Sequence, residues 1–139
     1  MTKHIVAPLK EFPPDTRKLV EINGRQIAVF NVKGEFHALG NKCPHESGLL
    51  IHGQLVGLVE SRMPGEYTYS RKGEMIKCPW HGWEFDLRTG RAQCDPARIR
   101  VRRYETAVVH GGDIDPDTPP KAAEVFAVRV EDDYVVVEV

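Results

Sequence analysis

Two short stretches of the chain each place a cysteine, a proline and a histidine close together. The first reads Cys43-Pro44-His45 and the second reads Cys78-Pro79-Trp80-His81. A proline fixes its own φ angle and has no N–H group, so the proline after each cysteine stiffens the turn that carries it. Two such turns that face each other present two thiolates and two imidazoles to one small volume. The predicted metal ligands are Cys43, His45, Cys78 and His81.

A set of two cysteines and two histidines holds either a structural zinc ion or a [2Fe–2S] cluster in which two histidines replace two cysteines on one iron. Zinc fingers usually pair cysteine with cysteine and histidine with histidine along the chain, and a helix carries the histidines. Here each loop mixes the two residue types and lies among strand-like, glycine-rich sequence. This order favours the iron–sulfur cluster, and a zinc-stabilised interaction module is the alternative.

These stretches resemble the cluster loops of the Rieske iron–sulfur family. Residues 78–86, followed by Thr89-Gly90-Arg91, are similar to the second cluster loop of Rieske ferredoxins and of the Rieske domains of ring-hydroxylating oxygenases. Residues 43–48 resemble the first loop less closely, because the family often has a small pair of residues there. The resemblance implies one [2Fe–2S] cluster, with two thiolates on a buried iron and two imidazoles on an iron near the surface.

Size and composition predict one domain over residues 1–139, with the cluster-binding part at about 40–95. The 139 residues, 41% of them hydrophobic, allow a single modest core. A net charge of −1 gives no electrostatic reason to expect nucleic acid or an anionic membrane as a partner. Of three cysteines only Cys94 lies outside the ligand pairs, so no disulfide framework is expected and a reducing cytoplasm is the simpler location.

The sequence also predicts a soluble protein. The segment Met1–Pro14 lacks the basic and apolar regions of a signal peptide, and no run of residues approaches the eighteen apolar positions of a membrane span. Within the family this disfavours the membrane-tethered respiratory subunits. Those proteins also carry a disulfide between the cluster loops, and the matching positions here are Gly48 and Trp80.

The predicted fold class is all-β. Apolar runs between residues 18 and 39 are separated by Asn23-Gly24 and Lys33-Gly34, which predicts an antiparallel meander with two tight turns. Residues 125–130 and 134–139 are expected to form a closing hairpin, and no helical period of useful length occurs. We therefore expect an antiparallel sandwich or barrel base that carries a small cluster-binding subdomain made of the two ligand loops, which is also the fold that the resemblance implies.

The spacer between the ligand pairs is long. Thirty-two residues separate His45 from Cys78, about twice the spacer of the simple ferredoxins that the chain resembles. The excess is placed in an enlarged loop at about 56–75, with turns at Pro64-Gly65 and a small hairpin around Arg71-Lys72-Gly73. This loop is either a partner-docking surface or an insertion without a partner.

Three further features of the sequence have two readings each. The run Arg98-Ile99-Arg100-Val101-Arg102 alternates, so its arginines form a basic ridge that either binds an acidic partner or is simply solvated. His37 is read as a half-buried strand residue rather than a metal ligand, and Cys94 as a structural thiol rather than a redox-active one.

The predicted function is one-electron transfer, from a flavin- or NAD(P)H-dependent reductase to an oxygenase or another acceptor protein. A complete oxygenase also needs an iron held by two histidines and a carboxylate, and only His110 follows His81. The alternative is a small redox subunit, such as that of nitrite reductase. Trp83 stands where high-potential family members carry a serine that donates to the cluster, so a low potential within the Rieske range is expected.

Overall fold

The computed structural model describes residues 3–42, 49–63, 66–79, 83–94, 96–113 and 132–139, and backbone only for residues 57–73. The described part of the chain consists of strands and short 3-10 helices, with no α-helix, which confirms the all-β prediction. None of its helices is long or apolar enough to span a bilayer. The strands are β1 (Lys3–Pro8), β2 (Arg17–Ile22), β3 (Arg25–Val32), β4 (Glu35–Gly40), β5 (Gln54–Met63), β6 (Glu66–Lys77), β7 (Glu84–Asp86), β8 (Arg103–Tyr104), β9 (Thr106–His110) and β10 (Asp133–Glu138). The 3-10 helices are η1 (Leu9–Glu11), η2 (Leu50–His52) and η3 (Gly111–Asp113).

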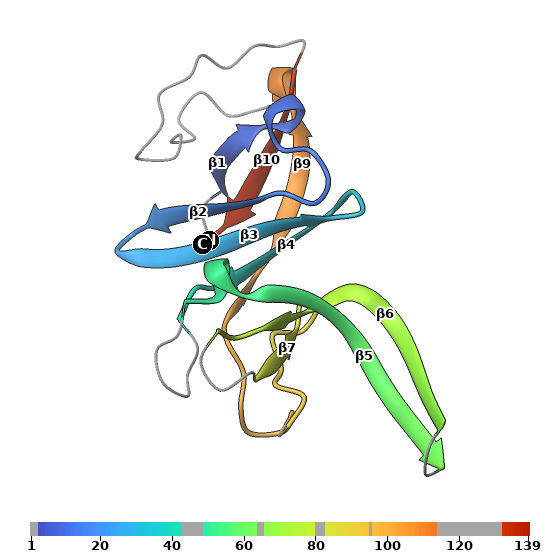
Figure 1. Ribbon diagram of the computed structural model, residues 1–139. Helices are drawn as coiled ribbons and strands as arrows, with labels where there is room; N and C mark the ends of the chain where they lie inside the picture. The colour runs from blue at the N-terminus through green and yellow to red at the C-terminus, as the bar shows by residue number, and fades with distance from the viewer. Residues whose placement is uncertain (1–2, 43–48, 64–65, 80–82, 95, 114–131) are drawn as a thin grey trace.

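The strands form three antiparallel sheets, with the strand orders β1-β10-β9, β2-β3-β4-β8 and β5-β6-β7. In Figure 1 the first sheet lies above the second, the third lies below it, and the β5–β6 hairpin extends away from the body. The two ends of the chain are drawn close together in this view.

The predicted meander is confirmed. β2, β3 and β4 pair in sequence order, and the turns between them contain the two predicted dipeptides. Asn23 and Gly24 have φ angles of 53° and 78°, and Lys33 and Gly34 have φ angles of 54° and 90°. Positive φ at both central residues is the type I′ geometry, whose twist matches that of the flanking strands. Local turn chemistry therefore sets the register of this sheet.

The sheet that contains β3 is covered on both faces. Ile27 and Val29 pack toward the β1-β10-β9 sheet, in a core that includes Val135 and Val137. The alternate residues Ala28 and Phe30 pack on the other side, in the core that contains Cys78 and Phe85. This burial on both faces explains why β3 is a nearly continuous apolar run. The same strand thus connects the base of the fold to the core beneath the predicted ligand loops.

The enlarged loop expected at 56–75 is instead a long β-hairpin. β5 and β6 pair antiparallel up to Met63 and Glu66, so the chain turns at 64–65, which lies outside the described residues. The prediction of a small hairpin around Arg71-Lys72-Gly73 is wrong, because β6 continues through this segment. Its register against β5 shifts there, from Val56 opposite Met75 to Leu58 opposite Ser70. The segment that looks like a turn in the sequence forms a bulge in β6, because pairing with β5 on both sides of it keeps the strand continuous.

Two predictions for the second half of the chain also change. Along Tyr134–Val137 both edges of β10 are occupied, by β1 and β9, so its partners are not those of the expected closing hairpin. Residues 125–130, the other half of that hairpin, lie outside the described residues. In the run 98–102 the arginines are exposed and Val101 is buried, as the alternation predicts, but the strand β8 begins only at Arg103.

Gly53 marks a close contact between the start of β5 and the end of β6. A Cβ atom on Gly53 would lie 2.5 Å from the carbonyl oxygen of Lys77 and 3.1 Å from two carbons of Ile76. The φ of Gly53 is −74°, which any residue can adopt. The requirement for glycine here is therefore steric. It comes from the approach of η2 to the strand that leads into Cys78.

We predict that Gly53→Ala destabilises the protein by about 2 kcal/mol, because the added methyl group displaces the backbone of β6. Urea unfolding, followed by fluorescence, measures this change. Gly40→Ala is the matched control, since its Cβ would meet atoms of Arg102 no closer than 3.8 Å. Equal stability of the two variants would contradict the steric reading of this contact.

Candidate metal centre

The base of the first ligand loop is closed by backbone contacts. Lys42 and Leu49 form an antiparallel bridge, and the N–H of Leu50 donates to the carbonyl of Asn41 over 2.7 Å. Cys43 and His45, the two predicted ligands of this loop, lie outside the described residues. The chain therefore leaves and re-enters the described fold at one narrow point, just beyond the end of β4.

Asn41 connects the two ends of this loop through its side chain. It is 1% exposed, and its Oδ1 accepts a hydrogen bond of 2.9 Å from the N–H of Ile51. Its Nδ2 donates to Oε1 of Gln26 over 3.2 Å, and its backbone N–H donates to the carbonyl of Gln26 over 3.0 Å. A buried amide that satisfies its partners in this way fixes the local backbone. Asn41 thus fastens the start of the loop to β3 and to the residues that follow the loop.

Arg17 holds the segment after the loop from the other side. Its Nη1 donates to the carbonyl oxygens of Ile51, over 3.0 Å, and Gly53, over 2.6 Å. The guanidinium lies 5.2 Å from the centroid of the Phe30 ring, within the range of a cation–π contact. Partial burial lowers the pKa of Arg17 from its usual value, but an arginine remains charged near neutral pH. Arg17 therefore holds this segment as a charged hydrogen-bond donor to two neutral carbonyl groups.

The second ligand loop is closed at Cys78. Its side chain is 2% exposed, and its backbone N–H donates to the carbonyl of Trp83 over 2.7 Å. β6 ends one residue earlier, and its last residues pair with β7, which begins just after Trp83. The loop is therefore the connection of a tight β6–β7 hairpin. His81, the fourth predicted ligand, lies outside the described residues.

The bases of the two loops lie next to each other. Gln54 pairs with Lys77, so β5 begins beside the residue that precedes Cys78. Leu50 and Cys78 belong to the same buried cluster, with Ile51 and Trp83 packed against it. Pairing and packing thus bring together two chain segments that are nearly thirty residues apart in sequence. This is the placement that a site shared by both loops requires.

The chemistry of the donor set fits an iron–sulfur cluster. Thiolates are the cysteine form that binds metal. A thiolate in the apolar surroundings of Cys78 would carry a large desolvation cost, which a cationic metal centre offsets. A [2Fe–2S] cluster held by this chain would take two thiolates and two neutral imidazoles, and it would supply one-electron redox chemistry.

The other residues discussed from the sequence have ordinary positions. His37 is half-buried on β4, and burial lowers its pKa, although Glu35 at 3.7 Å opposes this shift. Cys94 is exposed rather than packed inside the fold, so its reading as a structural thiol finds no support from burial.

The family of the protein follows from sequence comparison. The profile of the Rieske [2Fe-2S] domain matches residues 2–105 of the 139-residue chain. The chain belongs to the Rieske [2Fe–2S] domain family. Membership implies one Rieske-type cluster and confirms the resemblance seen in the two cysteine–histidine loops.

Relatives in this family include ferredoxins of oxygenase systems. The ferredoxin component of the naphthalene 1,2-dioxygenase/salicylate 5-hydroxylase systems of Ralstonia sp. is 29% identical over 102 residues, which cover 73% of this chain and 83% of the relative. The ferredoxin subunit of 3-phenylpropionate/cinnamic acid dioxygenase of Escherichia coli K12 is 34% identical over 93 residues, which cover 67% and 73% of the two chains.

Two solved structures support the fold. The ferredoxin of carbazole 1,9a-dioxygenase from Nocardioides aromaticivorans IC177 has a TM-score of 0.61 at 21% identity and covers 97% of both chains. A putative NADH-dependent nitrite reductase small subunit from Mycobacterium tuberculosis has a TM-score of 0.60 at 21% identity, with coverage of 99% and 96%. At this identity the two structures show a shared fold only.

Asn41 and Arg17 were missed by the sequence reasoning. Asn41 lies two residues before Cys43, next to a glycine, and its position there suggests only a turn. Arg17 is 26 residues from the first ligand pair, and its contacts depend on the pairing of β2 with β3. No local pattern in the sequence marks either residue as part of the site.

We predict that Arg17→Gln destabilises the protein by about 2 kcal/mol, because two hydrogen bonds from a charged donor are lost. The segment that closes the first loop is then held less firmly, so the cluster should be lost faster. The measurement is the decay of visible absorbance in the presence of an iron chelator. Lys18→Gln, a change at the next residue of β2, is the control. Equal rates of absorbance decay in both variants would contradict this role of Arg17.

Proposed function

We propose that this chain is a one-electron carrier whose Rieske cluster is held by Cys43, His45, Cys78 and His81. The observation that carries the proposal is the junction at Cys78. A buried thiol at the closed base of one loop lies in the same core as Leu50, which closes the other loop. The assignment of the other three ligands rests on their spacing in the sequence and on family membership.

The donor set suits the transfer of single electrons at a moderate potential. Replacing two thiolates by neutral imidazoles makes the cluster less negative, which places Rieske potentials at about −150 to +300 mV, against about −400 mV for plant-type ferredoxins. Hydrogen bonds to the cluster sulfurs raise the potential further. Trp83, at the position of the serine donor in high-potential members, is half-buried against the core and has no hydroxyl group to donate.

The proposed partners are a reductase that supplies electrons and a terminal oxygenase that receives them. The support comes from relatives that are ferredoxin components of dioxygenase systems. A structural neighbour has also been solved as a complex of reduced oxygenase with oxidised ferredoxin, in the carbazole 1,9a-dioxygenase system. We further propose that the carrier works in the cytoplasm, which agrees with a sequence that offers no disulfide framework.

A second candidate is a small redox subunit of a nitrite reductase. Two neighbours described as putative nitrite reductase small subunits cover nearly all of this chain, with TM-scores of 0.57 and 0.60. Their identities of 16% and 21% are below the 29% and 34% of the two ferredoxin relatives found by sequence, which supports the carrier as the first choice. Affinity isolation from native cells distinguishes the electron carrier from the nitrite reductase subunit. A permanent subunit is recovered together with one large chain per copy.

We predict a midpoint potential in the lowest part of the Rieske range, near about −150 mV, with one electron per chain. A spectroelectrochemical titration measures both quantities. Trp83→Ser should raise the potential if its hydroxyl reaches a cluster sulfur, and Trp83→Phe is the control for lost bulk. A wild-type midpoint near the upper end of the range would contradict the proposed role of this position.

A further inference from the structure

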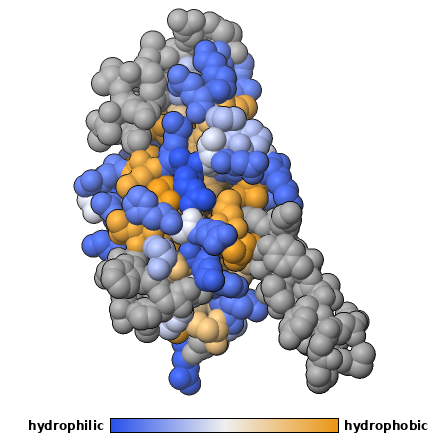
Figure 2. Space-filling model, viewed as in Figure 1, coloured by the Kyte–Doolittle hydropathy of each residue, from blue (hydrophilic) through white to orange (hydrophobic). Residues whose placement is uncertain are grey.

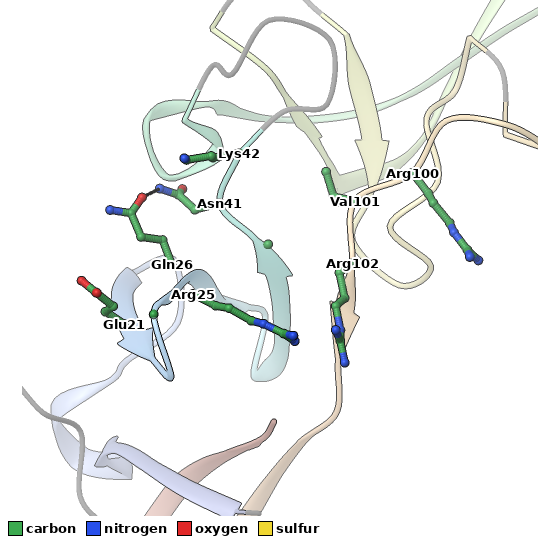
Figure 3. A pocket seen from close by; sticks show the side chains of 10 residues that line it. Glu21, Arg25, Gln26, Asn41, Lys42, Arg100, Val101 and Arg102 are labelled. Carbon is green, nitrogen blue, oxygen red and sulfur yellow. Dashed lines mark hydrogen bonds between the residues drawn. The ribbon is translucent and has the colours of Figure 1, made fainter. Parts of the chain in front are cut away.

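A basic hollow lies beside the first ligand loop. It has a volume of about 460 Å³ and lies between the start of β3, the end of β4 and the segment before β8. Its charged lining consists of Arg25, Lys42, Arg100, Arg102 and a single carboxylate, Glu21. Lys42 directly precedes Cys43, so the hollow adjoins the predicted cluster site. Arg25, Lys42 and Arg102 give this hollow an excess of positive charge in a chain whose net charge is −1, whereas the Arg100 side chain points away from them in Figure 3.

The basic side chains of the hollow differ from two arginines elsewhere in the described part of the chain that have carboxylate partners. Arg88 is paired with Glu74, and Arg103 with Glu105. Within the described residues, Arg25, Lys42 and Arg100 have no ion-pair partner. The Arg102 guanidinium lies 5.2 Å from the Tyr104 ring, and this contact leaves its charge unneutralised. The positive charge of the hollow is therefore available to a partner.

Two arginines from different elements line the hollow. Figure 3 shows the Arg25 side chain extending from β3 toward Arg102 across the hollow. Two like charges that converge without a carboxylate between them repel each other, and an anion placed there relieves the repulsion. Guanidinium groups bind carboxylates with two parallel hydrogen bonds, so a carboxylate is the ligand that this pair suits.

The floor of the hollow is rigid. The N–H of Gly40 donates to the carbonyl of Arg102 over 2.8 Å, which fastens β4 to the arginine-bearing segment. Asn41, 1% exposed, reaches Gln26 with its amide, as the dashed line in Figure 3 marks. Burial of Val101 turns its neighbours Arg100 and Arg102 outward, about 7 Å apart along the extended chain. The backbone thus sets the positions from which the cations project.

The surroundings favour a protein over a small molecule as the occupant. Small-molecule sites usually enclose the ligand between apolar walls, whereas Val101 is the single buried hydrophobic side chain that lines this hollow. Figure 2 shows hydrophilic side chains interspersed with hydrophobic ones on the coloured part of the visible face. Among the residues whose side chains the structure describes, which excludes 57–73, only Leu19 and Val108 are exposed large hydrophobic residues. A partner that docks on the hollow would therefore meet charged groups and the aliphatic parts of their side chains rather than a set of large hydrophobic residues.

The other end of β3 carries charges of both signs. Arg25 is at the start of the strand, and Asn31, about 20 Å away at roughly 3.3 Å per residue, contacts Phe12 next to η1. Lys33 directly follows the strand, and Lys10 of η1 is paired with Asp132. Lysines at this end therefore serve as a comparison for the cations of the hollow.

We propose that the hollow docks an acidic patch of a redox partner, with carboxylates of that partner between Arg25 and Arg102. The inference rests on the proposed electron-carrier function. Transient electron-transfer complexes use small contacts, and charge complementarity raises their association rate and fixes their orientation. Docking next to Lys42 places the partner beside the loop that carries two of the proposed ligands.

Stopped-flow electron transfer to two haem proteins tests this proposal. The holo-protein is reduced with dithionite and freed of excess reductant by gel filtration under argon. One electron then passes from the reduced cluster to a ferric haem, which becomes ferrous. The probes are cytochrome b5, which is acidic, and cytochrome c, which is basic. The variant Arg25→Gln/Arg102→Gln is compared with Lys10→Gln/Lys33→Gln, which removes the same charge at the far end of β3.

At low ionic strength we expect the arginine variant to reduce cytochrome b5 about tenfold more slowly than the wild type, and the lysine variant to change little. The difference should disappear at about 0.5 M salt, where charges are screened. Arg25→Lys/Arg102→Lys should restore most of the rate, which a structural defect would not allow, and the arginine variant should not slow cytochrome c.

Two results would overturn the inference, and they are distinguishable. If the wild type reduces both probes but the arginine variant is no slower than the lysine control, the hollow is not a docking site while the carrier function stands. If the wild-type protein, with its cluster intact by electron paramagnetic resonance, reduces neither probe, the proposed carrier function itself fails and the docking inference fails with it.

Discussion

The site depends on the antiparallel pairing of Gln54 with Lys77, which sets the start of β5 beside the end of β6. Without this pairing the two cysteine–histidine loops belong to separate parts of the chain. Gly53 allows the approach because it has no side chain, and Cys78 follows one residue after the pair. A cluster shared by both loops needs its ligands held in place before metal binds, since ordering them afterwards would cost conformational entropy.

Two side chains far from each other in sequence strengthen this junction. Asn41 ties the start of the first loop to the segment after it, and Arg17 holds the same segment through two carbonyl groups. Both are anchored on the sheet that contains β3, whose other face packs on the base of the fold. The β1-β10-β9 sheet thus supports the β2-β3-β4-β8 sheet, from which Asn41 and Arg17 hold the first loop in place. The basic hollow lies along the same layer, next to the first loop.

Local chemistry made part of this structure predictable. Asn23-Gly24 and Lys33-Gly34 form the two predicted turns with positive φ, and the alternation around Val101 correctly separates buried from exposed residues. The ligand candidates are recognisable because cysteine and histidine at short spacing have few other uses. The long β5–β6 hairpin was missed because its register depends on pairing across strands, and a glycine in a bulge looks like a turn. The roles of Arg17 and Asn41 depend on tertiary contacts, which no local pattern encodes.

The central claim is that both loops contribute to one cluster with two histidine ligands. Pulsed electron paramagnetic resonance of the dithionite-reduced protein, produced with and without ¹⁵N-labelled histidine, tests it most directly. The account predicts a [2Fe–2S] signal coupled to nitrogens of two histidines, and both couplings should change on labelling. A cluster without histidine coupling, or a colourless protein that contains one zinc ion, would contradict it.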